Sequence, residues 1–221
     1  MTKQSDLEVK CQKMYCELGK EFQNSDFGFK IFNSPPIYQT PLLFVGYQPG
    51  GGKEEYDYEV SRATHLKWPC QIEYLTEDWL LARRMRATFG TETLEHCVGM
   101  NAIFLRYPNV AHYKRAMSRE RRAKAEAFCF EKVQEIINLI KPEKIVTIGF
   151  STLNLFGPTE PLPLPNPKRR SLIHKGMIGN CKAIAMIHLT GARPPPSSEE
   201  RDLIRDCVTS NPVTSSQSCR T

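Results

Sequence analysis

The sequence predicts an α/β protein, a three-layer α/β/α sandwich around a mostly parallel four-stranded sheet. Apolar runs at residues 42–45, 98–105, 144–149 and 181–188 alternate with segments that have helical periodicity. Strands that alternate with helices are typical of parallel sheets. The unbroken apolar run at residues 42–45 is also typical of a strand that is covered on both faces.

The first half of the chain predicts two helices and two strands. Residues 5–22 should form a helix, since apolar residues at 7, 11, 14, 15 and 18 share one face. The proline-containing residues 24–40 should connect this helix to the first strand. A second helix should begin at Thr76, whose side chain can cap it, and end at Gly90. The strand at residues 98–105 follows and is interrupted by Asn101.

The second half continues the alternation. Residues 118–140 predict the clearest helix, because one apolar stripe runs along it and Pro142 stops it. The strand at 144–149 and a short helix at 151–156 precede a proline-rich loop at 157–167. The strand at 181–188 delivers His188 to its carboxyl end. Ser197 and Glu200 have the spacing of a capping box that begins the last helix.

These elements suggest an N-terminal helical extension (1–30), one main domain (31–209) and a disordered tail (210–221). The 221 residues are 40% hydrophobic, which is enough to build one core. The chain has no apolar run of eighteen residues, and its start lacks the apolar stretch of a secretory signal. We therefore expect an intracellular monomer, in the cytoplasm or with the nucleoid or nucleus, without membrane contact.

Eight cysteines are present without any C-x-x-C pair, so neither a zinc ribbon nor a redox motif is indicated. Most should be reduced thiols. Cys11, Cys16, Cys70 and Cys97 could supply four thiolates to an iron–sulfur cluster, although their spacing matches no known run. No metal site or cofactor is predicted.

The formal charge of +6 is unevenly distributed. Basic residues gather at 83–86, at 114–124 and at 168–170. Such clusters attract polyanions, so nucleic acid is a plausible partner. A solvated helix face is the alternative for each cluster.

A glycine-rich loop at residues 46–52 follows the first strand. Glycines allow a sharp turn and close approach to a ligand, and ligands bind at the carboxyl ends of strands in open α/β sheets. The loop is not a Walker motif, because Tyr47 and Glu54 replace the first glycine and the hydroxyl residue. It is not a dinucleotide fingerprint either, since Gln48 replaces the second glycine. A glycine-rich turn without chemistry remains an alternative.

Polar residues stand at three strand ends or within an apolar strand: Gln48, Asn101 and His188. Parallel strands bring their carboxyl ends to one edge, so these side chains can converge in a pocket. Each has a simpler interpretation as well. Asn101 could satisfy a neighbouring backbone group, and a single strand-end histidine is often structural.

Residues 46–50 (GYQPG), 100–106 (MNAIFLR) and 188–193 (HLTGAR) resemble, in this order, motifs of the uracil-DNA glycosylase superfamily. The resemblance extends over roughly residues 40 to 195. It implies a uracil-DNA glycosylase-like domain that binds DNA and excises a base after flipping it into a pocket. Two differences stand out: Gln48 occupies a position where the family often has Asp or Asn, and Leu189 and Thr190 replace Pro and Ser.

The resemblance also implies roles for individual residues. Gln48 would orient the attacking water, Asn101 would bind the edge of the base, and His188 would stabilise negative charge on the departing base. The remaining assignments are Gly46, Tyr47, Pro49 and Gly50 in the base pocket, Tyr56 or Tyr58 as its aromatic floor, and Thr190, Gly191 and Arg193 in a loop that enters the minor groove.

The expected activity is hydrolysis of the N-glycosidic bond of uracil or another deaminated base, as in base-excision repair. Because Gln48 cannot act as a base at neutral pH, a catalytically weakened protein that binds DNA or a free base is the alternative. A small-molecule hydrolase built on the same sheet is a third possibility.

Overall fold

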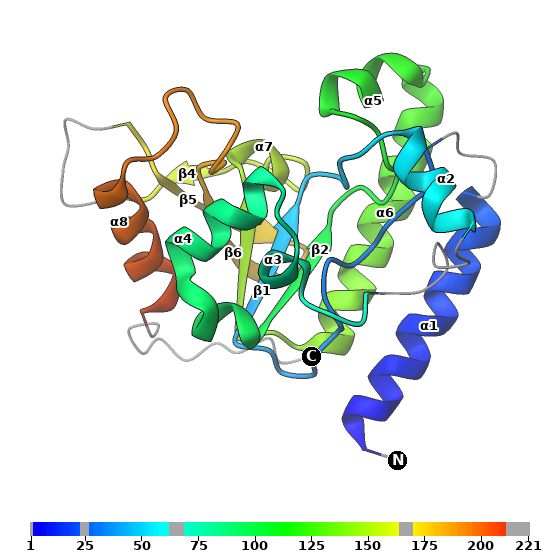
Figure 1. The fold of residues 1–221 in the computed structure, drawn as a ribbon, viewed down its shortest axis with the longest axis horizontal. Helices are drawn as coiled ribbons and strands as arrows, with labels where there is room; N and C mark the ends of the chain where they lie inside the picture. Colours follow the sequence, from blue (N-terminus) through cyan, green and yellow to red (C-terminus); the bar gives the residue numbers. More distant parts are fainter. Residues whose placement is uncertain (1, 23–26, 62–68, 164–169, 211–221) are drawn as a thin grey trace.

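The computed structural model describes residues 2–22, 27–61, 69–163 and 170–210. It contains a six-stranded sheet in the order β2-β1-β3-β6-β5-β4. Four strands are parallel: β1 (Leu42–Gly46), β2 (Cys97–Asn101), β3 (Lys144–Ile148) and β6 (Cys181–Met186). The prediction of an α/β protein with a mostly parallel sheet is therefore confirmed (Figure 1).

The predicted number of four strands is wrong, because two antiparallel strands extend the sheet. They are β5 (Ile173–Ile178) and the short β4 (Glu160–Pro161), which lies within the segment predicted as a proline-rich loop. Only the two end residues of β5, Ile173 and Ile178, are buried, so it lacks the continuous apolar run by which the other strands were recognised.

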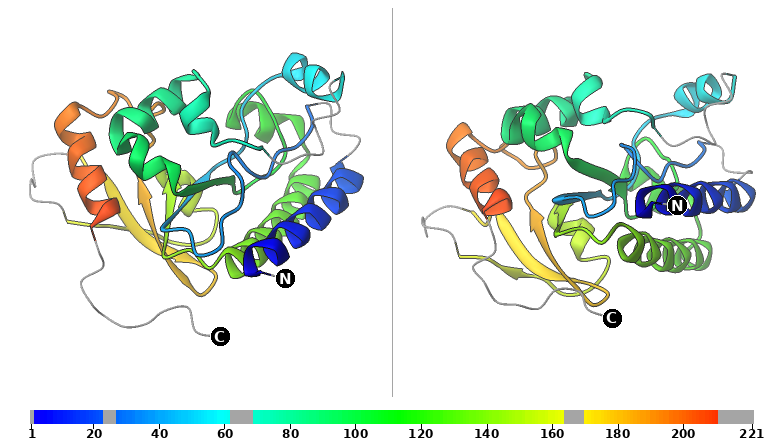
Figure 2. Two further views of the ribbon diagram at one scale, coloured as in Figure 1. Left: turned by 60° about the horizontal axis from the view of Figure 1, so that its bottom comes forward. Right: turned by 90° about the horizontal axis from the view of Figure 1, so that it is seen from below.

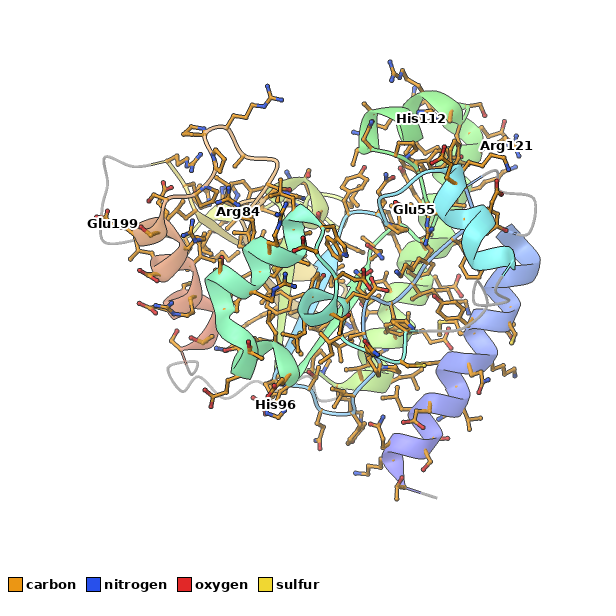
Figure 3. All side chains as sticks on the ribbon, viewed as in Figure 1. Glu55, Arg84, His96, His112, Arg121 and Glu199 are labelled. Atoms are coloured by element: carbon orange, nitrogen blue, oxygen red, sulfur yellow. The ribbon has the colours of Figure 1, made fainter. Side chains whose placement is uncertain are left out.

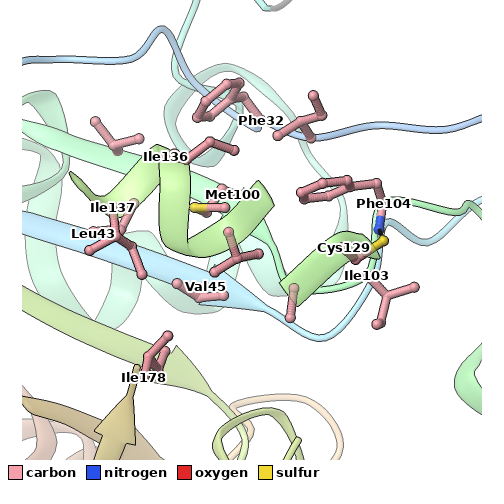
Figure 4. Packing of buried hydrophobic residues seen from close by; sticks show 14 of the residues in the cluster. Phe32, Leu43, Val45, Met100, Ile103, Phe104, Cys129, Ile136, Ile137 and Ile178 are labelled. Carbon is pink, nitrogen blue, oxygen red and sulfur yellow. Dashed lines mark hydrogen bonds between the residues drawn. The ribbon is translucent and has the colours of Figure 1, made fainter. Parts of the chain in front are cut away.

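Helices cover both faces of the sheet (Figure 2). One core cluster contains residues of α1 (Lys3–Phe22) and α6 (Arg119–Ile140) together with Leu43 and Val45 of β1. The other contains residues of α4 (Leu80–Glu95) and α8 (Ser198–Thr209) with Leu42 and Phe44. Successive side chains of β1 thus point to opposite faces, as the pleat of a strand requires. Figure 4 shows the first of these clusters.

The first core cluster includes the apolar face of α1. Leu7, Cys11, Met14 and Tyr15 are buried there, and the Tyr15 hydroxyl accepts a hydrogen bond from the Ile31 backbone N–H at 3.3 Å. Helix α1 (Lys3–Phe22), within the predicted extension at 1–30, therefore shares this core cluster with the sheet. Of the tail predicted from residue 210, only Ser210 lies within the described residues.

Helix α6 matches its prediction closely. The Ser118 side chain accepts a hydrogen bond from the Arg121 N–H at the N-terminus, and Lys141 ends the helix in a left-handed conformation with φ 54°. Three helices were not predicted: α2 (Lys53–Ser61), α3 (Glu73–Thr76) and α5 (Val110–Ala116). The predicted helix at 151–156 is the shorter α7 (Phe150–Leu153).

The helix expected to begin at Thr76 begins instead at Leu80. Thr76 is the last residue of α3, where its hydroxyl donates to the Ile72 carbonyl at 3.4 Å and so does not cap the following helix. At the other end, Gly90 has non-helical backbone angles, φ 74° and ψ 165°, so the first helical segment stops there as predicted, and a second segment of α4 continues to Glu95.

Strand β2 ends at Asn101 and not at residue 105, although the chain after it stays bonded to the end of β1 and the loop that follows. The N–H groups of Ala102 and Ile103 donate to the carbonyls of Gly46 and Tyr47, at 2.7 and 2.9 Å. Residues 24–40 were predicted to be a connector only. In the structure Phe29 and Phe32 of this segment form isolated antiparallel β-bridges with Leu105 and Met100.

The four cysteines considered for an iron–sulfur cluster do not form one site. Cys11 and Cys97 belong to core clusters on opposite faces of the sheet, while Cys16 and Cys70 are exposed. Burial raises the pKa of both the Cys11 and Cys97 thiols to about 12, which keeps them protonated. Among the described residues, no three His, Cys, Asp or Glu side chains gather as a metal site. No helix in the described ranges has the length and apolar character that membrane crossing requires.

The capping box of α8 is formed as predicted: the Glu200 N–H donates to the Ser197 hydroxyl at 3.2 Å, and the Ser197 N–H donates to the Glu200 carboxylate at 2.9 Å. Ser197→Ala should lower the free energy of unfolding by about 1 kcal/mol, because one N-terminal N–H loses its partner. Urea denaturation measures this. Ser198→Ala, one residue into the helix, is the control and should change stability by less than half as much. Equal losses would contradict the capping role.

Candidate functional site

The carboxyl ends of β1 and β2 form the first part of the candidate site. Gly46 lies directly opposite Asn101 in the parallel register. A Cβ atom at Gly46 would lie 3.1 Å from Asn101 Oδ1, so the glycine allows the amide to approach the backbone. The Asn101 side chain is buried, and its Nδ2 faces the carbonyls of Lys30 and Ile31, both at 3.4 Å. The amide oxygen is consequently directed toward Gly46.

The loop after β1 holds the Gln48 amide in one orientation. Gln48 Nε2 donates to the Tyr107 carbonyl at 3.1 Å. Gln48 Oε1 is buried and accepts no hydrogen bond from any described residue. An amide fixed through its nitrogen presents its oxygen as an acceptor, and a buried acceptor strongly favours a hydrogen-bond donor.

The other residues of the loop differ in exposure. Pro49 is buried, whereas Gly50 is exposed and open space lies where its Cβ would be. Tyr47 is half-buried, and its pKa is raised by burial and by the nearby Glu126 carboxylate. The loop thus carries a neutral tyrosine, a fixed amide and an open glycine.

His188 lies two residues beyond the end of β6, with its Nδ1 acting as an acceptor. The N–H groups of Thr190 and Gly191 point at Nδ1, at 3.2 and 2.9 Å, and the Thr190 hydroxyl lies 3.2 Å away. Because Nδ1 accepts these bonds, the proton of the neutral ring is on Nε2. Burial also lowers the pKa of His188. At neutral pH the ring is therefore an uncharged donor through Nε2.

Two glycines make room for the His188 ring. A Cβ at Gly149 would lie 3.3 Å from its Cδ2, and a Cβ at Gly191 would lie 3.2 Å from its Cγ. Gly149 also has φ 92°, which favours glycine. No role was predicted for Gly149, although its position directly after β3 was a usable signal.

The three polar side chains share an edge of the sheet without touching one another. Strand β3 lies between β1 and β6. Two strand spacings amount to roughly 10 Å between the backbones that carry Gln48 and His188. Asn101 belongs to β2, one spacing farther out. The end of β3 and Gly149, which follows it, lie between the amides and the imidazole.

The predicted aromatic floor is placed only in part. The Tyr56 ring of α2 lies against Gly28, whose φ of 73° and missing side chain accommodate it. Tyr58 also belongs to α2, and its side chain lies outside the described residues.

The loop predicted to enter DNA is anchored on one side. Thr190 and Gly191 hold His188, and Arg193 is exposed. Sequence reasoning placed Arg170 only in the basic cluster at 168–170. In the structure it donates to the Pro194 carbonyl and pairs with the Glu200 carboxylate at 3.0 Å. An open hollow of about 540 Å³ lies beside this contact and is lined by Arg170, Pro194, Pro195, Ser197 and Glu200.

Comparison with known proteins does not add a family assignment. No protein-family model matches the chain, and no curated protein is significantly similar to it. The function must therefore be argued from the geometry of the site.

We predict that His188 is neutral and protonated on Nε2 at pH 7. Its pKa should lie below the ordinary value of about 6.5, because burial disfavours the charged ring. In the pH range between the unfolded pKa of about 6.5 and the lower pKa of the folded state, His188 binds more protons in the unfolded chain than in the folded protein. The contribution of His188 therefore lowers the free energy of unfolding as pH falls through this range. Long-range ¹H–¹⁵N NMR spectra report both the tautomer and the titration. A proton on Nδ1, or a pKa above 6.5, would contradict this description.

Proposed function

We propose that the protein is a DNA glycosylase that hydrolyses the N-glycosidic bond of uracil or another deaminated base in DNA. The observation that carries this proposal is the presence of two oriented amides, Gln48 and Asn101, and a neutral imidazole, His188, at one edge of the sheet. The motif resemblance to uracil-DNA glycosylases supports it independently of this geometry. A uracil-DNA glycosylase-like three-layer domain at residues 31–209 is the corresponding fold.

The chemistry needs recognition of an extruded base. A base flipped out of the duplex presents its Watson–Crick edge to the pocket. The Asn101 oxygen would accept a hydrogen bond from a ring N–H, which uracil and hypoxanthine carry on that edge and cytosine lacks. The carbonyls of Lys30 and Ile31 oppose rotation of the amide, because rotation would place oxygen against oxygen.

Bond cleavage then needs a nucleophile and a stabilised leaving group. The Gln48 oxygen would orient a water molecule toward the sugar carbon C1′. As the C1′–N bond breaks, its electron pair leaves with the base, and the His188 Nε2–H donates a hydrogen bond to the resulting anion. The water oxygen bonds to C1′ and releases its proton to solvent, because an amide cannot accept it.

The second candidate is a protein that binds damaged DNA or a free base without cleaving it. The observation in its favour is Gln48 itself, since an amide orients water but does not act as a general base at neutral pH. General-base catalysis contributes roughly 10²–10⁴-fold where it operates, and this protein would lack that factor.

Asn101→Ala should reduce excision of uracil, hypoxanthine or xanthine from oligonucleotides by roughly 10- to 100-fold, as expected of a base contact worth about 1–3 kcal/mol. Binding to undamaged DNA should change little, because phosphate contacts supply most of it. Alkaline cleavage of abasic sites measures excision. Asn138→Ala, an exposed asparagine on α6, is the control. Equal loss of excision and binding would count against Asn101 as a base reader.

Gln48→Ala should slow excision by roughly 100-fold while affinity for uracil-containing duplex is retained, because the lost contact acts on water and not on the base. Single-turnover kinetics separates the two effects. Gln12→Ala on the exposed face of α1 serves as the control. Absence of strand breaks above a heat-denatured sample with the unmodified protein would reject the glycosylase proposal in favour of the binding protein.

A further inference from the structure

The segment from α5 to the first turns of α6 carries a concentration of basic side chains. Between residues 110 and 124 there are six Lys or Arg residues and one acidic residue, Glu120. Two of the basic residues are engaged: Arg122 lies 3.7 Å from Glu126, and Lys124 lies 3.0 Å from Glu120. The other four form what we call the α5–α6 cation cluster: Lys114, Arg115, Arg119 and Arg121.

All four members of the α5–α6 cation cluster are exposed. Within the described ranges, none of them has an ion pair with a carboxylate. The basic residues at 83–86 differ in this respect. Arg86 donates to the carbonyls of Tyr74 and Leu75 and lies 3.5 Å from Asp78, which also lies 3.8 Å from Arg83. Arg83 and Arg86 thus have acceptor partners within the protein, whereas the charges of the α5–α6 cation cluster are available to an external anion.

The positions of Arg119 and Arg121 are unfavourable for an isolated helix. Both lie in the first turn of α6, where the positive end of the helix dipole repels cations. An external anion at this turn would be attracted by the guanidinium groups and by the helix end together. The charge arrangement therefore favours a bound polyanion over a merely solvated helix face.

The cluster is held rigidly. Tyr113 of α5 is buried, and its hydroxyl donates to Glu126 of α6 at 3.2 Å. Arg122 Nη1 donates to the Lys114 carbonyl at 2.9 Å and ties the end of α5 to α6. The Asn109 side chain caps the start of α5 by accepting from the His112 N–H at 2.8 Å. The backbone that carries the four cations is therefore ordered before binding, and only their side chains would lose conformational freedom on contact with an anion.

The cluster also lies on the same side of the molecule as the candidate site. Figure 1 shows α5 and the loop between β6 and α8 projecting beyond the same edge of the sheet, on opposite sides of it. Figure 3 places His112 and Arg121 on the first of these projections. Arg193 belongs to the second. Strands β2 and β6, from which the projections arise, are three strand spacings apart, or roughly 14 Å.

We propose that the α5–α6 cation cluster binds the phosphates of DNA on the side of the target base opposite to Arg193. This inference extends the proposed function and rests on it for the choice of DNA as the polyanion. Because the two projections arise from strands three spacings apart and lie on opposite sides of the sheet edge, they would contact different phosphates of the duplex. The two arms would then hold the duplex on either side of the base that is flipped.

The test compares two double variants with the same loss of charge. Arg119→Gln with Arg121→Gln removes part of the cluster, and Lys141→Gln with Lys182→Gln removes two exposed cations near the opposite edge of the sheet. Binding of an undamaged duplex is measured against salt concentration. The slope of log K against log salt should become shallower by about 2 in the first variant and stay unchanged in the second.

Lys114→Gln with Arg115→Gln provides an independent pair in case the first variant is unstable, and it should lower the slope similarly. Shortening the duplex on one side of a central uracil should lower affinity for the unmodified protein and leave the cluster variants unaffected. Excision at saturating DNA should remain within twofold in all variants, because these side chains do not touch the reacting atoms.

Two outcomes would overturn the proposal. In the first, the slope of log K against log salt is the same in the unmodified protein and in every variant. In the second, the slope becomes shallower by the same amount in the cluster variants and in the Lys141/Lys182 control. Loss of binding to phosphatidylserine vesicles without a change in the DNA slope would assign the cluster to membranes instead. Because binding is measured on undamaged DNA, a protein without excision activity but with the predicted slopes would refute the glycosylase and retain the DNA contact. Excision activity together with unchanged salt slopes would support the glycosylase and refute the DNA contact of the cluster.

Discussion

The parallel register that places Gly46 opposite Asn101 holds the candidate site together. Beyond the ends of β1 and β2, the N–H groups of Ala102 and Ile103 donate to the carbonyls of Gly46 and Tyr47. The two segments that follow these strands are therefore hydrogen-bonded to each other. A shift by one residue would move Asn101 to the other face of the sheet. It would also bring a side chain in place of Gly46 against the amide. The site therefore depends on backbone pairing before any side-chain contact is made.

The three polar groups assigned to the site are uncharged. Gln48 and Asn101 are amides that are each oriented by backbone carbonyls, and His188 is kept neutral by burial and by the two N–H groups at its Nδ1. A carboxylate beside the ring would have raised its pKa. Neutral donors suit a reaction in which negative charge develops on a departing base, since they stabilise the anion without a counter-charge that would hold the substrate equally well.

The sequence allowed the parallel part of the sheet to be predicted, because strands covered on both faces are continuous apolar runs. Helix α6 and the capping box of α8 were predictable as well, since both depend on local residues. The start of α4 was not, because Thr76 bonds backward into α3, and β5 was missed because only its two end residues, Ile173 and Ile178, are buried. Two buried residues separated by four less buried ones form no continuous apolar run and no strand period.

The candidate site was predictable only at the level of strand ends. Gln48, Asn101 and His188 were found because parallel strands must bring those ends together. The hydrogen bonds that orient them depend on turns that the sequence does not specify: the Tyr107 carbonyl, the Thr190 and Gly191 N–H groups, and the room left by Gly149. Such partners lie far away in sequence or depend on a particular backbone conformation.

The central claim is that two amides and one imidazole line a common cavity that accepts a nucleobase. Titration of ¹⁵N-labelled protein with free uracil tests it most directly. The account predicts that the Asn101 side-chain amide, the Gln48 side-chain amide and His188 Nε2 change their NMR signals together, with a single dissociation constant. Signals that respond at only one of the three groups, or with different constants, would contradict a shared base pocket.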